Sequence, residues 1–283
     1  MAFNSRTVNS STPKSSVERE KRATPGMTDV SKTLFLPLFF RAQETREDGI
    51  IRDQAAVDIV DRLQYDNQNF RVDREMQLII SLRTAILDRI TRQYIDETIK
   101  MGRQPVVINL GAGLDTREYR FPEATWYQVD LAAPITLRQQ YVQGSKATNI
   151  AASIFEEGWS SQIAHRDHVL VLVEGVLMYF GAEMVRKFFE ILSRDFTHVT
   201  IAFDALAKRY SKLHAHQSID VDKAAFKCGV SCGTDVEKMN PGFKTVEEFG
   251  YYQEYLSHSE MLQKRYRLIR FDATHKIYLM YKK

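Results

Sequence analysis

The stretch VVINLGAGLDTREYRF, residues 106–121, places a short β-strand pattern directly before a loop that contains two glycines. Three consecutive β-branched residues open the stretch, and Gly111 and Gly113 follow where the apolar run ends. A missing Cβ allows a sharp turn and lets ligand atoms approach the backbone closely. Because ligands of doubly wound α/β sheets bind at the carboxyl ends of the strands, the stretch predicts a strand and a binding loop. An ordinary strand-to-helix turn is the alternative.

The residues after the loop indicate which ligand it would hold. Asp130 ends the next predicted strand, 17 residues after Gly113, and a carboxylate there can accept hydrogen bonds from both hydroxyls of a ribose. Thr116 stands where a dinucleotide-binding fingerprint has its third glycine. The pattern therefore favours a nucleoside without phosphates, and an NAD-dependent oxidoreductase is the weaker alternative.

Hydrophobic periodicity on both sides of the loop predicts an α/β fold. Residues 28–100 space their apolar positions by three and four, which is typical of helices. Short β-rich runs then alternate with helical stretches, and such alternation predicts βαβ units in a mostly parallel sheet. The β-rich runs are residues 106–110, 125–130, 168–174 and 198–204, and the helical stretches lie around 133–142 and 183–194.

Chain length and element order predict one folded domain after a disordered tail. With 283 residues and 44% hydrophobic content, the chain can bury the core of one large α/β domain. Residues 266–283 predict two strands joined by a short polar turn, an antiparallel hairpin at the edge of the sheet. The expected division is a tail (1–26) and a single domain (27–283), which comprises a helical cap (27–100), a core (101–204), a lid insertion (205–256) and the hairpin (257–283).

Composition argues against several classes of partner. Residues 1–26 are rich in Ser and Thr, a composition typical of a disordered segment. The rest of the chain has 34 basic and 34 acidic residues, so no basic face for nucleic acid is expected. No apolar run approaches the ~18 residues that span a bilayer, and no secretory signal pattern opens the chain. We expect a cytoplasmic protein with a small-molecule substrate and without a nucleic-acid or membrane partner. Cys228 and Cys232 have no second pair at zinc spacing, so no metal site is predicted.

Five segments together resemble one known family. They are TDVSKTLFLPLFFRAQET (28–45), SLRTAILDRI (81–90), NLGAGLDTREYR (109–120), the acid of VD at Asp130, and LVEGVLMYF (172–180). In this order they resemble the leucine carboxyl methyltransferase family, which includes bacterial O-methyltransferases of polyketide and other natural-product pathways. The resemblance covers residues 28–283. It implies a class I, Rossmann-like methyltransferase fold and S-adenosyl-L-methionine as the cofactor.

The resemblance also implies cofactor contacts at individual positions. Arg83 matches the arginine that binds the methionine carboxylate, a role that suits a planar guanidinium with parallel donors; an exposed helix arginine is the alternative. Glu174 matches an acid near the cofactor's amino group. A buried carboxylate there needs a cationic partner or a proton, and the ligand's ammonium would supply the cation. The other positions to which the resemblance assigns cofactor contacts are Lys32, Gly111, Gly113, Asp130, Leu131, Ser153 and Ile154.

Ser153 and Ile154 depart from the family pattern, which usually has Asp-Leu beside the adenine. A serine hydroxyl can still accept a hydrogen bond from an amino group, but it carries no charge. We therefore expect the affinity for the cofactor, or the alignment of its adenine, to differ from the family pattern.

The residues around the methyl acceptor are less defined. Displacement at a sulfonium needs proximity, collinearity and a dry pocket, so no obligatory catalytic residue is assigned. Candidate residues are Tyr179, Asp204, Arg209, His214 and His216, although the two histidines could equally be solvated helix residues. The aromatic residues Phe226, Phe243, Phe249, Tyr251 and Tyr252 either wall a pocket or form a small core under the insertion.

These observations predict an S-adenosyl-L-methionine-dependent O-methyltransferase that acts on a small-molecule carboxylate or hydroxyl, in secondary metabolism. A carboxylate is slightly favoured, because it is ionised at neutral pH and needs no general base. The alternatives are a methyltransferase for the C-terminal carboxylate of a protein and a module that binds the cofactor without transferring the methyl group.

Overall fold

The computed structural model describes residues 29–63, 74–206, 232–251 and 275–282. The helices are α1 (Asp29–Arg46), α2 (Gln54–Leu63), α3 (Arg74–Lys100), α4 (Arg117–Arg120), α5 (Ala132–Tyr141), α6 (Ala182–Asp195) and α7 (Gly233–Met239), with the short 3₁₀ turns η2 (Trp159–Gln162) and η3 (Leu177–Tyr179). The strands are β1 (Val106–Leu110), β2 (Thr125–Asp130), β3 (Thr148–Ala151), β4 (His168–Val173), β5 (His198–Leu206), β6 (Phe243–Gly250) and β7 (His275–Lys282).

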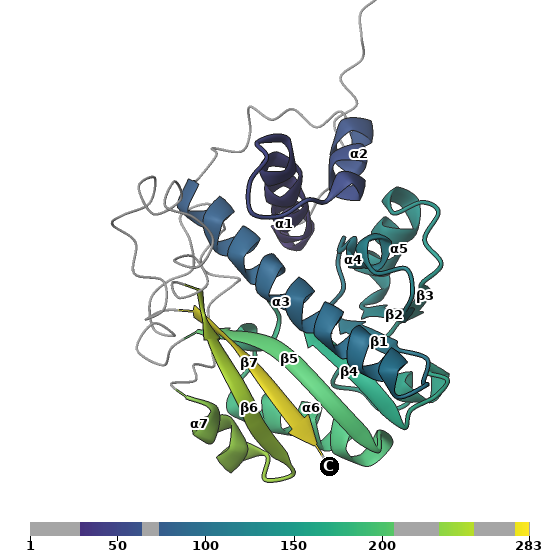
Figure 1. Ribbon diagram of the computed structural model, residues 1–283, viewed down its shortest axis with the longest axis vertical. Helices are drawn as coiled ribbons and strands as arrows, with labels where there is room; N and C mark the ends of the chain where they lie inside the picture. The colour runs from purple at the N-terminus through teal and green to yellow at the C-terminus, as the bar shows by residue number, and fades with distance from the viewer. Residues whose placement is uncertain (1–28, 64–73, 207–231, 252–274, 283) are drawn as a thin grey trace, which may run out of the picture.

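The described strands form one sheet in the order β3-β2-β1-β4-β5-β7-β6 (Figure 1). The first five are parallel, and β7 is antiparallel to both β5 and β6. The strand order reverses between β1 and β4, whose register pairs Leu110 with Val173. In a doubly wound sheet this reversal marks the place where a ligand binds, so the loops after Leu110 and Val173 are where a site is expected.

Helices cover both faces of the sheet, because the central parallel strands are apolar on both sides. All five residues of β1 are buried. On one face they pack with α6 through Phe188 and Leu192, and on the other with α3 through Leu82 and Ile86. Figure 1 shows α3 in front of the sheet and α6 behind it.

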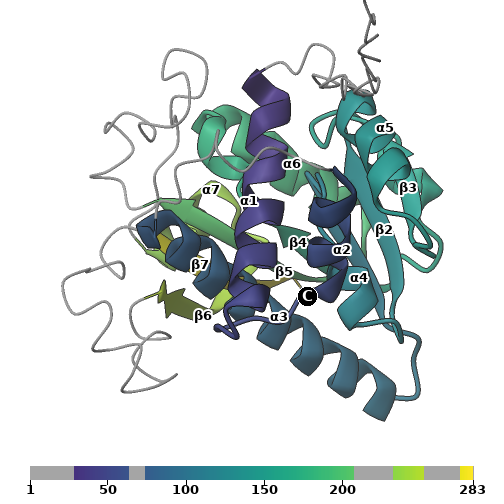
Figure 2. The same ribbon diagram turned by 90° about the horizontal axis from the view of Figure 1, so that it is seen from above.

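Helices α1 and α2 form a separate apolar layer over the loop that follows β1. Phe39 and Ile59 pack in one cluster with Leu114 of that loop. Pro37 lies inside α1, and α1 and α2 lie beside each other over the sheet in Figure 2. Of the predicted helical cap (27–100), α1 and α2 therefore lie on the loop that contains the two glycines, whereas α3 covers one face of the sheet.

The predicted α/β fold with a mostly parallel sheet is confirmed, with three differences in detail. Strand β3 was not predicted, and β6 lies within the expected lid insertion but belongs to the sheet. Of the predicted hairpin, residues 275–282 form β7, which pairs with β6, whereas residues 266–271 and the tail (1–26) lie outside the described residues. None of the helices in the described ranges has the length and apolar character that a membrane span requires.

Candidate functional site

Both glycines of the loop after β1 have positive φ angles, 71° at Gly111 and 47° at Gly113, a region that side chains disfavour. A Cβ on Gly111 would lie 2.3 Å from Cγ2 of Val176, and one on Gly113 would lie 3.0 Å from Cδ2 of Leu34. The space beside the glycines is thus used by the segment after β4 and by α1. Close packing and backbone conformation together explain why the loop needs glycine.

Asp130, the predicted ribose acid, closes this loop against the end of β2. Its carboxylate accepts hydrogen bonds from the N–H of Gly113 at 2.8 Å and of Leu131 at 2.7 Å. Burial raises its pKa above the usual value, even though both amides favour the charged form. Each carboxylate oxygen has a second lone pair, so the same group can still accept hydrogen bonds from ligand hydroxyls. Leu131 beside it is exposed.

Arg83 projects from α3 to the carboxyl ends of β4 and β5. Its Nε donates to Glu174 Oε1 at 2.9 Å and its Nη1 donates to Asp204 Oδ2 at 3.0 Å. Its side chain is only 12% exposed, so the alternative of an exposed helix arginine is wrong. Its Nη2 has no hydrogen-bond partner among the described residues, which leaves one edge of the guanidinium able to bind an anion.

Glu174 has cationic partners within the protein, contrary to the expectation that a ligand would supply the cation. Its Oε1 accepts from Arg83, and its Oε2 accepts from Arg117 Nη2 at 2.9 Å. Burial disfavours the charged carboxylate, but the two guanidinium groups hold the pKa of Glu174 below its usual value. Glu174 is therefore ionised and fixed in position at neutral pH.

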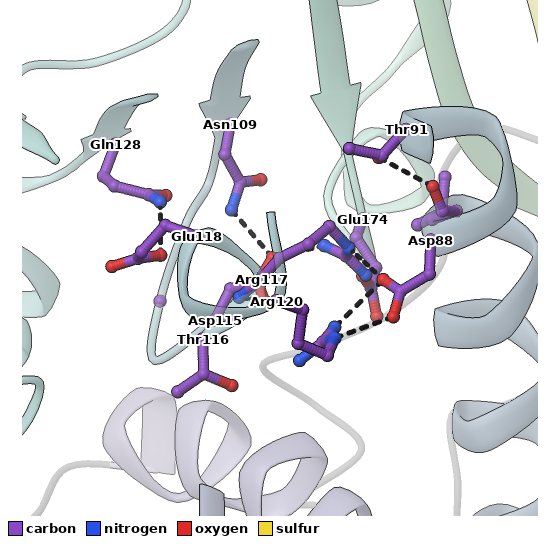
Figure 3. Close-up of polar contacts among 12 residues, drawn as sticks. Asp88, Thr91, Asn109, Asp115, Thr116, Arg117, Glu118, Arg120, Gln128 and Glu174 are labelled. Carbon is purple, nitrogen blue, oxygen red and sulfur yellow. Dashed lines mark hydrogen bonds and ion pairs between the residues drawn. The ribbon is translucent and has the colours of Figure 1, made fainter. Parts of the chain in front are cut away.

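Arg117 connects this site to the helical cap through further ion pairs (Figure 3). The guanidinium is fully buried and binds Asp88 at 2.6 Å and Asp115 as well as Glu174. Arg120 binds Asp88 at 2.7 Å and Asp53 at 2.7 Å, and Asp53 also binds Arg41 of α1 at 3.0 Å. We call this set the ion-pair network; its members are Arg41, Asp53, Arg83, Asp88, Asp115, Arg117, Arg120, Glu174 and Asp204.

Two further predicted residues are Asp204, which belongs to the network, and Tyr179. Asp204 is 1% exposed and accepts from Arg83 and from the N–H of Gly175 at 2.7 Å; burial raises its pKa. Tyr179 lies in η3, and burial raises the pKa of its hydroxyl too. The low exposure of Asp204 favours a role in holding Arg83 over direct contact with an acceptor.

The residues that depart from the family pattern follow β3. Ser153 Oγ accepts from the N–H of Phe155 at 3.3 Å, and Ile154 is buried in the core of the sheet. Lys32 lies in α1, and nothing further is described for its side chain. Arg209, His214, His216, Phe226 and Tyr252 lie outside the described residues.

Of the aromatic residues in the expected insertion, the described ones are core residues. Phe243 packs edge to face on Phe189 at 5.0 Å between ring centroids, and Phe249 lies under the guanidinium of Arg89 at 5.2 Å. Tyr251 stacks on His275 at 5.7 Å. Within the part of the chain that the structure describes, no group of three or more His, Cys, Asp or Glu could hold a metal ion.

Comparison with known proteins gives a family match and a set of structural neighbours. The sequence model described as Leucine carboxyl methyltransferase matches residues 35–193. Among solved structures, a candidate methyltransferase from Thermobifida fusca YX has 13% sequence identity and a TM-score of 0.52, and the alignment covers 86% of this chain and 94% of that one. At this identity the likeness shows the fold alone. No curated protein sequence matches the chain.

Two other similar structures contain a bound cofactor. Magnesium protoporphyrin IX methyltransferase from Synechocystis PCC 6803, with bound SAM, has 13% identity, a TM-score of 0.47 and coverage of 92% of this chain and 99% of that one. LepI in complex with SAM has 7% identity and a TM-score of 0.46. The alignment with LepI covers 68% of this chain and 46% of LepI, so this chain spans less than half of that protein.

Proposed function

Because the chain belongs to the leucine carboxyl methyltransferase family, we propose that it is an S-adenosyl-L-methionine-dependent O-methyltransferase that acts on a small molecule. The observation that carries the proposal is the pair formed by Arg83 and Glu174 at the switch in strand order, next to the glycine loop. One edge of the Arg83 guanidinium has no partner among the described residues. An anionic group of a ligand can bind there through parallel hydrogen bonds.

The donors and acceptors at this edge fit the cofactor that family membership implies. The guanidinium of Arg83 suits the methionine carboxylate, Glu174 suits the ammonium, and Asp130 suits the ribose hydroxyls. The exposed side chain of Leu131 lies directly after Asp130 and suits the flat face of a base. Ser153 offers a hydroxyl but no carboxylate near the adenine.

Methyl transfer requires the protein mainly to position the reactants and to exclude water. The bound cofactor supplies an electrophilic methyl group on a sulfonium sulfur. The ion-pair network holds Arg83 and Glu174 in fixed positions, which reduces the entropy cost of aligning the reactants. A carboxylate acceptor is ionised at neutral pH and needs no base, whereas an alcohol acceptor does need one.

We prefer a carboxylate group of a natural product as the methyl acceptor, for two reasons. The family resemblance favours both the carboxylate and the natural product, and the described residues at the strand ends contain no histidine or other exposed base beside Arg83. The acceptor itself would meet residues of the segment 205–256. Methylation of a protein C-terminus and cofactor binding without transfer are the competing functions, and the assay below separates them.

Labelled methyl transfer tests the proposal. The full chain is incubated with cofactor carrying a radiolabelled methyl group and with a metabolite extract from its own host, and small molecules are separated from proteins. Label in a small molecule that mild alkali releases as methanol supports a carboxylate acceptor, and alkali-stable label indicates a hydroxyl. Label in protein supports the C-terminal carboxyl alternative, and bound cofactor with no transfer supports the binding module.

A further inference from the structure

Arg138 of α5 binds the loop that contains Gly111 and Gly113 from within the protein. Its side chain is buried, with 1% of its surface exposed. Its Nη1 donates hydrogen bonds to the backbone oxygen of Asp115 and, at 3.4 Å, to that of Gly113. Both oxygens belong to the loop after β1, and Gly113 has a positive φ of 47°. A buried guanidinium thus holds the backbone at a position where the loop needs glycine.

The other nitrogens of this guanidinium are held by side chains of two further elements. Nε donates to Oδ1 of Asn149 in β3 at 3.1 Å, and Nη2 forms an ion pair with Glu118 of α4. Glu118 is fixed in turn, because its carboxylate accepts a hydrogen bond from Gln128 of β2 at 2.8 Å, as Figure 3 shows, and another from Ser145 at 2.8 Å. Each nitrogen of the Arg138 guanidinium therefore has an acceptor within the protein.

Arg138 also acts on Asp130, the predicted ribose acid. Gly113 connects the two residues, because its N–H donates to Asp130 at 2.8 Å and its carbonyl oxygen accepts from Arg138. Burial raises the pKa of Asp130, whereas hydrogen bonds from two backbone amides lower it. Arg138 is the charged side chain, within the described part of the chain, that lowers this pKa further. It thereby favours the ionised carboxylate, which can accept hydrogen bonds from both ribose hydroxyls.

We infer that Arg138 is a positioning residue of the cofactor site, which holds Gly113 and Asp130 in the arrangement that receives a ribose. The inference rests on the proposed function. Arg138 does not touch the ligand, because its guanidinium is buried and each nitrogen binds protein. It acts on the nucleoside half of the cofactor, whereas Arg83 acts on the methionine half. A site held in its bound conformation loses less entropy when the ligand binds.

Calorimetric titration of the full chain with two probes tests the inference. The probes are S-adenosylmethionine and methylthioadenosine, which keeps the adenine and the ribose but has no amino-acid group. Arg138→Met keeps the apolar stem of the side chain and removes its charge and donors. A hydrogen bond to a charged group corresponds to about tenfold or more in an equilibrium constant, so both probes should bind about tenfold more weakly. Arg83→Ala should weaken the binding of S-adenosylmethionine alone.

The dependence of affinity on pH distinguishes positioning from a general structural role. Loss of the Arg138 charge should raise the pKa of Asp130 further. Ribose hydroxyls donate to the ionised carboxylate, so the affinity is present above this pKa and is lost as the pH falls through it. In Arg138→Met the affinity for both probes should therefore decline at a higher pH than in the wild type. A general loosening of the fold would instead weaken binding by the same factor at every pH.

Two further variants complete the experiment. Arg62→Met removes another arginine that binds a backbone oxygen, that of Tyr141 at the end of α5, at 3.0 Å. This contact is exposed and remote from the glycines, so both affinities should be unchanged. Arg138→Met leaves Glu118 buried without its cation, which can prevent folding. In that case Arg138→Met with Glu118→Gln removes the unpaired charge, and the same loss of affinity is expected. Circular dichroism shows whether each variant is folded.

The outcomes separate this inference from the proposed function. Wild-type affinity for both probes in a folded Arg138 variant, or a loss confined to S-adenosylmethionine, would overturn the inference and leave the proposed function standing. A loss by the same factor at every pH would also overturn it. Absence of binding of either probe to the wild-type chain would overturn the proposed function. If the wild-type chain binds S-adenosylmethionine alone, the pH dependence of that binding decides.

Discussion

Replacement of Arg117 by methionine should destabilise the fold more than any exposed charge change. The guanidinium is fully buried and makes three charged hydrogen bonds, to Asp88, Asp115 and Glu174. At about 1.5–3 kcal/mol each, the three bonds are worth roughly 4–9 kcal/mol before the cost of burying the guanidinium is subtracted. Since removal of one partner leaves the others buried and uncompensated, we expect a net loss of about 3–5 kcal/mol.

Urea unfolding followed by circular dichroism measures this loss. Methionine keeps the apolar stem of the side chain, so the loss reports on charge rather than on packing. Arg52→Met is the matched control: its pair with Asp48 is 80% and 76% exposed, and its removal should cost about 0.5 kcal/mol or less. Addition of Asp115→Asn to Arg117→Met should recover part of the loss, because one unpaired carboxylate disappears.

Two results would refute this reasoning. A loss below about 1 kcal/mol for Arg117→Met would mean that Arg117 is not the buried centre of the network. Equal losses for Arg117→Met and Arg52→Met would mean that burial has no bearing on the strength of these pairs.

Three further predictions concern the loop, pH and the acceptor. Gly111→Ala should cost about 1–3 kcal/mol of unfolding free energy, because its φ is +71° and its Cβ would meet Val176; equal stability to wild type in thermal unfolding would contradict this. The partners of Asp53 hold its pKa below the usual value in spite of burial. The stability that the Asp53 carboxylate contributes is therefore present above its unfolded pKa of about 4 and is lost as the pH falls below that value. In Asp53→Asn the midpoint of thermal unfolding should fall less steeply with decreasing pH than in the wild type, and an unchanged dependence of the midpoint on pH would refute this prediction. If the acceptor is a carboxylate, His214→Ala and His216→Ala should each lower the methyl-transfer rate by less than about tenfold, whereas a loss of about two orders of magnitude in either would indicate a general base and a hydroxyl acceptor.

Much of the fold could be predicted because it depends on local patterns. The bounds of β1 and β2 were predicted as the structure has them, because both are short β-rich runs whose central residues are buried. Strand β3 escaped prediction because it has four residues, of which only Ile150 is buried. Strand β6 was assigned to the insertion because it has only two fully buried residues, Phe243 and Gly250, and no alternating pattern that would mark it as a strand of the sheet.

The site was predictable only in part because its contacts are distant in sequence. Gly113 and Asp130 belong to one short motif, and the structure joins them by a hydrogen bond. The partners of Arg83 lie 91 and 121 residues away, at Glu174 and Asp204, and no periodicity indicates such pairs. The many charged residues of LDTREYR (residues 114–120) were the sequence signal that could have indicated the ion-pair network, because charged side chains beside a buried strand need partners.

The most direct test of the account is the affinity of the Arg83 variants for S-adenosylmethionine, measured by calorimetry on folded protein. We expect Arg83→Ala to lose about 2 kcal/mol or more of binding free energy, because the ligand carboxylate loses its guanidinium and Glu174 loses one of its two cationic partners. Arg83→Lys should recover little, since an ammonium has no planar pair of donors. Wild-type affinity in folded Arg83→Ala would contradict the assignment of this site to the cofactor.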